Sequence, residues 1–150
     1  MEKIKEILNA AQKRAKEMSL PYEGALLPNE AYEIQHAAPG TKLVDVRTRS
    51  ELDWVGHIPG AVEIEWATYP GMKLNPYFIA QLEQQVGKEA LVLFICRSGA
   101  RSHNAATAAT EAGYAESYNV LEGFEGDKDA HKHRNVLGGW RARELPWEQS

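Results

Sequence analysis

The residues of this chain best suited to chemistry form one short segment, Cys96-Arg97-Ser98-Gly99-Ala100-Arg101-Ser102. Cys96 is the only cysteine among 150 residues, and it directly follows the apolar run 91–95. A helix N-terminus, loop amides and two arginines all favour a thiolate over a thiol. An inert core cysteine is the alternative, but it leaves the polar residues after Cys96 unexplained. The pattern therefore predicts a nucleophilic Cys96.

The segments that must position this loop alternate between strand and helix patterns. Short apolar, β-branched runs predict strands over 42–46, 62–64, 91–95 and 117–121. Helical spacing predicts helices over 1–18, from 28–30 onward, over 77–86 and over 103–112. This alternation is typical of a parallel sheet with helices on both faces, where ligands gather at the carboxyl ends of strands. Cys96 and the segment 45–47 lie at two such ends.

The length and composition indicate one globular domain. The formal net charge of −4 argues against nucleic-acid binding, which needs a basic surface. A single cysteine excludes an internal disulfide and a multi-cysteine zinc site. A lone reactive thiol fits a reducing compartment, here expected to be the cytoplasm. No window approaches the length of a membrane span, so we expect no membrane partner.

The N-terminal segment 1–18 has the pattern of an amphipathic helix, with apolar residues at helical spacing between charges of both signs. We expect this helix to pack on the domain. A membrane-surface or targeting helix is the alternative, which Glu2, Glu6 and Glu17 disfavour because they interrupt the basic face. Residues 1–24 are thus expected to form the helix and a linker, and residues 25–150 the main domain.

Three motifs follow one another along the chain. They are Leu43-Val44-Asp45-Val46-Arg47 with Gly56-His57-Ile58-Pro59-Gly60-Ala61, the cysteine segment 96–102, and Asn119-Val120-Leu121-Glu122-Gly123-Phe124 with Gly139-Trp140. Together they resemble the rhodanese-like domain family of sulfurtransferases over about residues 26–147. The resemblance implies an α/β fold with a central parallel five-stranded sheet, helices on both faces and, here, an extra N-terminal helix.

The resemblance also implies a mechanism. The Cys96 thiolate attacks the sulfane sulfur of a small anionic donor such as thiosulfate, releases sulfite and becomes a persulfide. Cyanide, an external thiol or a protein acceptor then removes the sulfur, and no cofactor or metal is needed. The alternatives are a phosphatase or arsenate reductase on the same fold, and a non-enzymatic sulfur-carrier or binding module. Phosphatase relatives have one more loop residue, so the six-residue loop from Cys96 to Arg101 favours sulfur transfer.

Each loop residue has an expected role in such a reaction. The amides between Arg97 and Arg101 are expected to hold an anion. Arg97 is the candidate for guiding the donor, whereas Arg101 is expected to neutralise the loop or to bond backbone carbonyls. Ser98 either donates to the terminal sulfur or shapes the turn. Gly99 is expected to supply a backbone shape that a side chain would hinder.

Other polar and aromatic residues are expected to support the site. Asp45 and Arg47 lie at a strand end, and a buried pair that braces neighbouring loops is favoured over a functional role. His57 has the chemistry of a general base, but the resemblance implies a structural turn residue. The tryptophans are expected to be packing residues, with Trp66 and Tyr69 as candidates to wall the pocket.

The segment 125–135 is longer than the turn that precedes the closing Gly-Trp helix in a minimal rhodanese domain. A solvated loop is the favoured interpretation. A metal site is a weaker alternative, with ligands drawn from His131, His133, Asp127 and Asp129. A third possibility is a lid in which Lys132 or Arg134 leans over the cysteine pocket.

Overall fold

All four strands predicted from apolar runs are present in the computed structural model, which describes residues 2–150. They are β2 (Lys42–Asp45), β3 (Val62–Glu63), β6 (Val92–Ile95) and β7 (Ser117–Val120), joined in one sheet by β1 (Gly24–Leu26). The strand order is β1-β7-β6-β2-β3, and every neighbouring pair is parallel. The predicted α/β fold with a central parallel five-stranded sheet is therefore confirmed.

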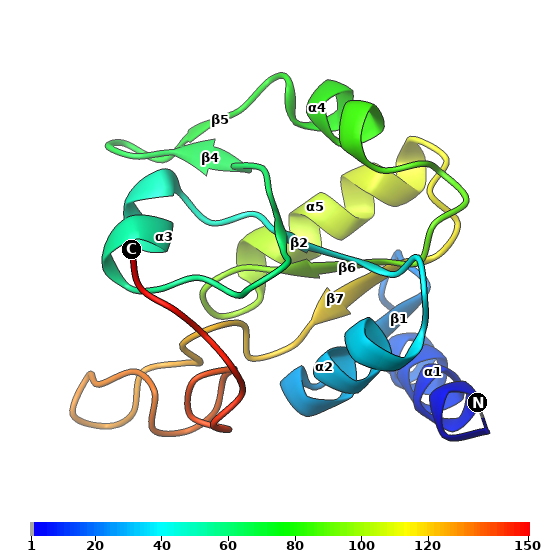
Figure 1. The fold of residues 1–150 in the computed structure, drawn as a ribbon, viewed down its shortest axis with the longest axis horizontal. Helices are drawn as coiled ribbons and strands as arrows, with labels where there is room; N and C mark the ends of the chain where they lie inside the picture. The colour runs from blue at the N-terminus through cyan, green and yellow to red at the C-terminus, as the bar shows by residue number, and fades with distance from the viewer. Residues whose placement is uncertain (1) are drawn as a thin grey trace.

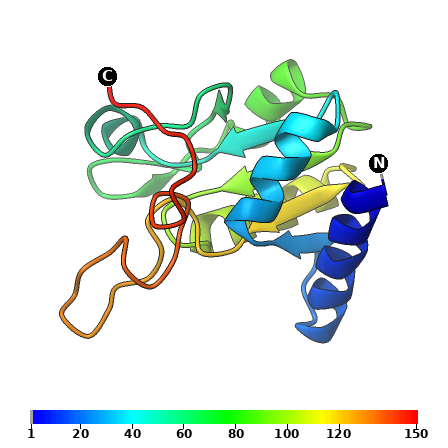
Figure 2. The same ribbon diagram turned by 60° about the horizontal axis from the view of Figure 1, so that its bottom comes forward.

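Helices cover both faces of this sheet (Figures 1 and 2). On one face lie α1 (Glu2–Glu17) and α2 (Pro28–Ala37), and on the other lie α4 (Phe78–Gln85) and α5 (Ala100–Glu111). Within β6, Val92 and Phe94 point into the core beneath α4 and α5, whereas Leu93 and Ile95 point into the core beneath α1 and α2. Because both faces are buried, the strand is a continuous apolar run rather than an alternating one.

The residues around position 24 form more than the expected linker. Gly24 begins β1, which pairs with β7 at the edge of the sheet. A β-carbon at Gly24 would lie 2.5 Å from the ring of Tyr118, so only glycine allows this close approach. The strand escaped prediction because it is three residues long and contains no β-branched side chain.

Two further elements lie where polar loops were expected. The first is α3 (Arg49–Trp54), which begins with a capping box between Thr48 and Glu51. The second is a hairpin of β4 (Ala67–Thr68) and β5 (Lys73–Leu74), whose strands are two residues each. Both elements are too short to show a hydrophobic period, although the Thr-x-x-Glu spacing at 48–51 was a readable start signal for α3.

One predicted helix begins at a different residue, and one segment near the C-terminus differs from a minimal rhodanese domain. Helix α5 begins at Ala100 rather than at residue 103, directly after Gly99. The segment around Gly139 and Trp140 forms turns rather than the closing helix of a minimal rhodanese domain. Trp140 is nevertheless fully buried, and its indole donates a hydrogen bond to the carbonyl of Pro146 at 2.7 Å.

The N-terminal helix α1 packs on the domain, as expected from its amphipathic pattern. Ala11 and Ala15 are buried on its inner face. Gln12 donates a hydrogen bond to the Tyr118 hydroxyl at 2.9 Å, and Arg14 pairs with Glu30 at 3.1 Å. Among residues 2–150, no helix combines the length and the apolar character that crossing a membrane requires.

Candidate active site

Cys96 is the first residue after β6, at the carboxyl end of the middle strand of the sheet. Its side chain is only 1% exposed and belongs to the core beneath α4 and α5. Two polar groups reach its sulfur: the amide of Gly99 at 3.1 Å and the hydroxyl of Ser102 at 3.3 Å. Both can present hydrogens to an ionised sulfur, so the loop is shaped to stabilise negative charge there.

The turn after Cys96 depends on Gly99. Its φ of +112° is a conformation that side chains with a β-carbon rarely adopt, which agrees with the shape expected of this glycine. Gly99 also caps α5, so the positive end of a 12-residue helix lies next to the sulfur. The side chain of Asn119 holds the loop from behind, donating to the Gly99 carbonyl at 3.3 Å and to the Tyr22 hydroxyl at 3.2 Å.

The loop is also braced by the backbone that follows β7. The amides of Phe124 and Glu125 donate to the carbonyls of Cys96 and Arg97 at 2.8 and 2.9 Å. Gly123 brings these two segments together, because a β-carbon there would lie 2.5 Å from the Arg97 carbonyl group. This contact gives a physical reason for glycine in the third motif.

We expect Gly123→Ala to lower the free energy of unfolding by about 2–4 kcal/mol, because the new methyl group meets backbone that cannot move aside cheaply. Urea denaturation measures this loss. Gly40→Ala is the matched control, since Gly40 also has a positive φ of 84° but would place its β-carbon in open space. Its expected cost is about 1 kcal/mol. Equal losses in the two variants would show that the contact with Arg97 is not important.

Arg101 is held by a carboxylate rather than by the backbone carbonyls that the sequence suggested. Its guanidinium donates to both carboxylate oxygens of Glu51 at 2.7 and 2.9 Å. Burial alone raises the pKa of Glu51, but the Arg101 bonds and charge, together with Thr48, outweigh burial and hold the pKa at about 2. Burial lowers the pKa of Arg101, but the bond to Glu51 outweighs burial and raises the pKa above its ordinary value. The pair ties α3 to the first turn of α5.

This pair predicts a specific acid dependence of stability. The pKa of Glu51 is lower in the folded chain than its ordinary value of 4.5. The ionised Glu51 carboxylate therefore stabilises the folded state above pH 4.5, and this stabilisation is lost as the pH falls towards about 2. We expect Glu51→Gln to cost up to about 3 kcal/mol at pH 7, with the difference from the parent protein shrinking between pH 4.5 and pH 2. Urea denaturation across this range measures it. A difference that stays constant with pH would contradict the assignment.

Arg97 is exposed, unlike Arg101, and forms no ion pair within residues 2–150. It therefore supplies an uncompensated positive charge beside the cysteine loop. Ser98 is half-buried, and Ser102 rather than Ser98 is the serine that reaches the sulfur. Ala100 is exposed at the first position of α5.

A cleft of about 400 Å³ opens on the outer side of the loop, and we call it the aromatic cleft. Its lining includes Trp54 from α3, Tyr69 and Met72 from the β4–β5 turn, and Arg97 and Arg101. Tyr69 thus walls a pocket as expected. Trp66 does not, because it packs inward against Phe78 with ring centroids 5.1 Å apart.

Asp45 and Arg47 form a fully buried ion pair at the end of β2, with Arg47 donating to Asp45 at 2.7 and 2.9 Å. Arg47 also donates to the carbonyl of Gly56 at 2.9 Å and lies 4.0 Å from the ring centre of Phe124. The contacts match a bracing role. His57 pairs through its backbone with Glu148 and lies outside the site, in agreement with a structural turn residue.

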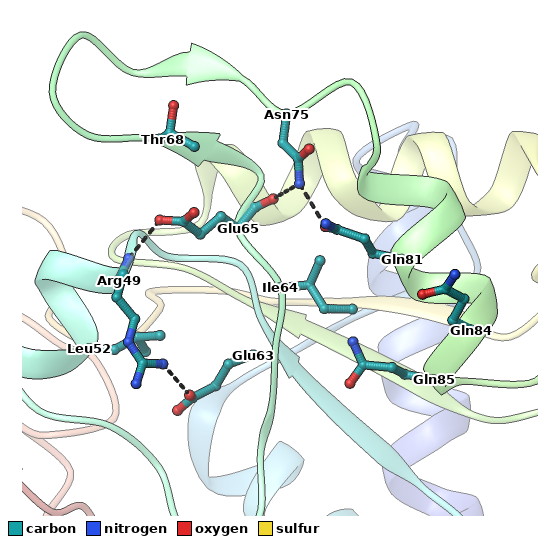
Figure 3. Close-up of a pocket in the computed structure, with 10 residues that line it drawn as sticks. All are labelled: Arg49, Leu52, Glu63, Ile64, Glu65, Thr68, Asn75, Gln81, Gln84 and Gln85. Carbon is teal, nitrogen blue, oxygen red and sulfur yellow. Dashed lines mark hydrogen bonds and ion pairs between the residues drawn. The ribbon is translucent and has the colours of Figure 1, made fainter.

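A second cavity, larger than the aromatic cleft, is not lined by Cys96. It has a volume of about 610 Å³ and lies between β3, α3 and α4 (Figure 3). Several of its polar lining residues bond to one another: Asn75 donates to the Glu65 carbonyl and to Gln81, and Arg49 pairs with Glu63. Its lining residues within 2–150 include no cysteine and no histidine, so the cysteine loop is the stronger candidate site.

The segment 125–135 projects from the body of the molecule as an exposed loop (Figures 1 and 2). Asp129 accepts hydrogen bonds from the amides of His131 and His133, so its carboxylate closes a turn. No cluster of three or more metal-ligating side chains occurs in residues 2–150. Arg134 donates to the carbonyl of Gly126, within the same segment, and no residue of the segment lines the aromatic cleft.

Comparisons with known proteins agree with this geometry. A model of the rhodanese-like domain matches residues 27–130. Uncharacterized protein RC0915 of Rickettsia conorii is 36% identical over 121 residues, which are 79% of this chain and 92% of that protein. The thiosulfate sulfurtransferase GlpE of Tolumonas auensis is 34% identical over 98 residues, which are 62% of this chain and 82% of that protein.

A solved structure matches the fold closely. The crystal structure of Rv0390 from M. tuberculosis has a TM-score of 0.79 with this chain at 43% sequence identity. The match covers 86% of this chain and 99% of that one. The overall fold of this chain is therefore shared with an experimentally determined protein.

Proposed function

The chain belongs to the rhodanese-like domain family, and from this premise we propose that it is a sulfurtransferase that carries sulfane sulfur on Cys96. The proposed donor is thiosulfate or another small anionic sulfur donor, and the acceptor is cyanide or a thiol. The reaction needs no cofactor, because the sulfur is held covalently as a persulfide. A reducing compartment such as the cytoplasm suits a lone reactive thiol.

One observation carries the proposal. Around Cys96, the Gly99 amide, the Ser102 hydroxyl and the start of α5 all place positive hydrogen ends or dipole charge at a single sulfur. Such a site favours a thiolate before the reaction and a persulfide anion after it, without a separate general base. Because the donors are held by backbone and by packed elements, they need no reorganisation during the transfer.

The first half-reaction follows from this arrangement. Arg97, exposed and without an ion-pair partner within residues 2–150, attracts the anionic donor. The Cys96 thiolate attacks the outer sulfur of thiosulfate, the bond between the two donor sulfurs breaks, and its electron pair leaves with sulfite. Arg101 does not serve as a second free cation, because Glu51 neutralises it. Its role is to position the loop against α3.

The alternative is a phosphatase or arsenate reductase on the same fold. The six residues from Cys96 to Arg101 favour sulfur over this alternative, since related phosphatases have a loop one residue longer. A phosphate group also needs several free donors at once. In this loop, one arginine is already paired with Glu51.

The test compares the two chemistries in one preparation. We expect thiocyanate to form from thiosulfate and cyanide with parallel-line initial-rate kinetics, the pattern of a covalent two-step transfer. We expect no hydrolysis of 4-nitrophenyl phosphate above the background of heat-denatured protein. Phosphate release without thiocyanate would overturn the proposal and favour the phosphatase.

A further inference from the structure

Three large apolar side chains are exposed together beside the cysteine loop. Trp54 is 74% exposed, Tyr69 is 61% exposed and Met72 is 44% exposed. They come from two elements, α3 and the β4–β5 turn, which lie close together in Figure 1 and line the same cleft. Exposed apolar groups that line one cleft mark a binding surface more often than isolated ones do.

The lining of the aromatic cleft combines two chemically different sets of side chains. One set is Arg97, which has no ion-pair partner within residues 2–150, and Arg101, whose charge is offset by Glu51. The other set is Trp54, Tyr69 and Met72, which contribute ring faces and a thioether. A ligand that satisfies both sets has an anionic head and a flat apolar body.

Neither thiosulfate nor cyanide has such a body. A cleft of about 400 Å³ lies within the usual range of small-molecule sites, about 300–1,000 Å³, and a benzene ring needs only about 150 Å³ of enclosed cavity. Both small anions would leave the Trp54 and Tyr69 surfaces in contact with water. Thiosulfate and cyanide therefore leave the aromatic part of the cleft lining without a ligand.

We infer that the aromatic cleft binds the apolar body of an organic thiol, which is the sulfur acceptor of this protein. The inference rests on the proposed function, because it describes the second half-reaction of the same site. The acceptor must come from outside the chain, since Cys96 is the only cysteine. When the ring of such a thiolate packs on Trp54 or Tyr69, its negative sulfur is attracted by the charge of Arg97, which lines the same cleft.

The transfer step balances without another reactant. A persulfide adds one sulfur about 2.05 Å beyond the buried Sγ of Cys96. The acceptor thiolate attacks this outer sulfur and forms a new sulfur–sulfur bond with its own electron pair. The bond between the outer sulfur and Sγ breaks, and its electron pair returns to Cys96 as the thiolate. The product is the persulfide of the acceptor.

The experiment follows discharge of the preformed Cys96 persulfide by intact mass, with either benzenethiol or cyanide as the acceptor. We expect Trp54→Ala and Tyr69→Ala each to lower the ratio of the benzenethiol rate constant to the cyanide rate constant about 5–10-fold, through weaker saturation rather than a slower maximal rate. Taking this ratio within each variant cancels the different intrinsic reactivities of the two acceptors.

Tyr77→Ala is the matched control, because Tyr77 is an equally exposed aromatic residue, 66% exposed, that lies outside the aromatic cleft. Its ratio should equal that of the parent protein. Equal ratios in all variants, with normal cyanide discharge, would overturn this inference alone. A fall seen with a cysteine-containing peptide but not with benzenethiol would also overturn it and assign the cleft to a protein acceptor. Failure to form a persulfide at all would instead overturn the proposed function.

Discussion

Replacing Cys96 with serine should abolish sulfur loading and reduce thiosulfate–cyanide turnover by at least about 10⁴-fold. The expected effect is this large because the sulfur is held covalently and Cys96 is the only thiol in the chain. Ser102 and Gly99 position the sulfur but supply no alternative nucleophile of comparable strength. A serine hydroxyl at position 96 would stay protonated near neutral pH and attack sulfane sulfur poorly.

Intact mass of the reduced protein before and after thiosulfate measures this directly. The parent protein should gain one sulfur, which cyanide then removes, and Cys96→Ser should gain none. Parent protein alkylated with iodoacetamide at Cys96 is the matched control, because it loses the thiol without any change of sequence. Sulfur gain by the serine variant would place the chemistry elsewhere, and no gain by the parent protein would refute thiosulfate as a donor.

The second large effect concerns stability. Asp45→Ala should lower the free energy of unfolding by about 3–5 kcal/mol, because it leaves the Arg47 guanidinium buried without its counter-ion. Both side chains are fully buried, and one Arg47 nitrogen already has no hydrogen-bond partner within residues 2–150. The guanidinium also contacts the Gly56 carbonyl and the Phe124 ring, and neither carries a negative charge. A domain of ordinary stability would lose a large part of its free energy of unfolding.

Urea denaturation measures the loss, and two comparisons make it specific. Arg49→Ala breaks exposed pairs with Asp53 and Glu63 and should cost less than about 1 kcal/mol. The double replacement Asp45→Leu with Arg47→Met removes both charges and should be no less stable than Asp45→Ala. If the single variant lost less than about 1 kcal/mol, the pair would not brace this end of the sheet.

Much of the fold was predictable because the relevant signals are local. The runs at 42–46 and 91–95 are continuous and apolar, as strands buried on both faces must be. Strand β1 and the β4–β5 hairpin were not predicted, since β1 contains no β-branched residue and the two-residue strands of the hairpin belong to no apolar run. The predicted start of α5, residue 103, is three residues too late, because the first turn of the helix begins directly after Gly99 and contains part of the polar cysteine segment.

The candidate site also has one part that the sequence predicts and another part that only the tertiary structure reveals. The sequence by itself predicts Cys96 and its loop as the candidate site, because a thiol, two arginines and a glycine within six positions need no distant partner to come together. Only the tertiary structure decided which arginine is free. Glu51 lies 50 positions before Arg101 and neutralises it, while Arg97 stays exposed.

The tertiary structure also decided the surroundings of the sulfur. Gly123 packs against the backbone of Arg97, and Trp54 and Tyr69 line the same cleft, although neither arrangement follows from spacing along the chain. The physical reason is that hydrophobic periodicity encodes whether a side chain is buried, not which distant segment lies against it. That choice depends on the order of the strands, which brings separate loops to one end of the sheet.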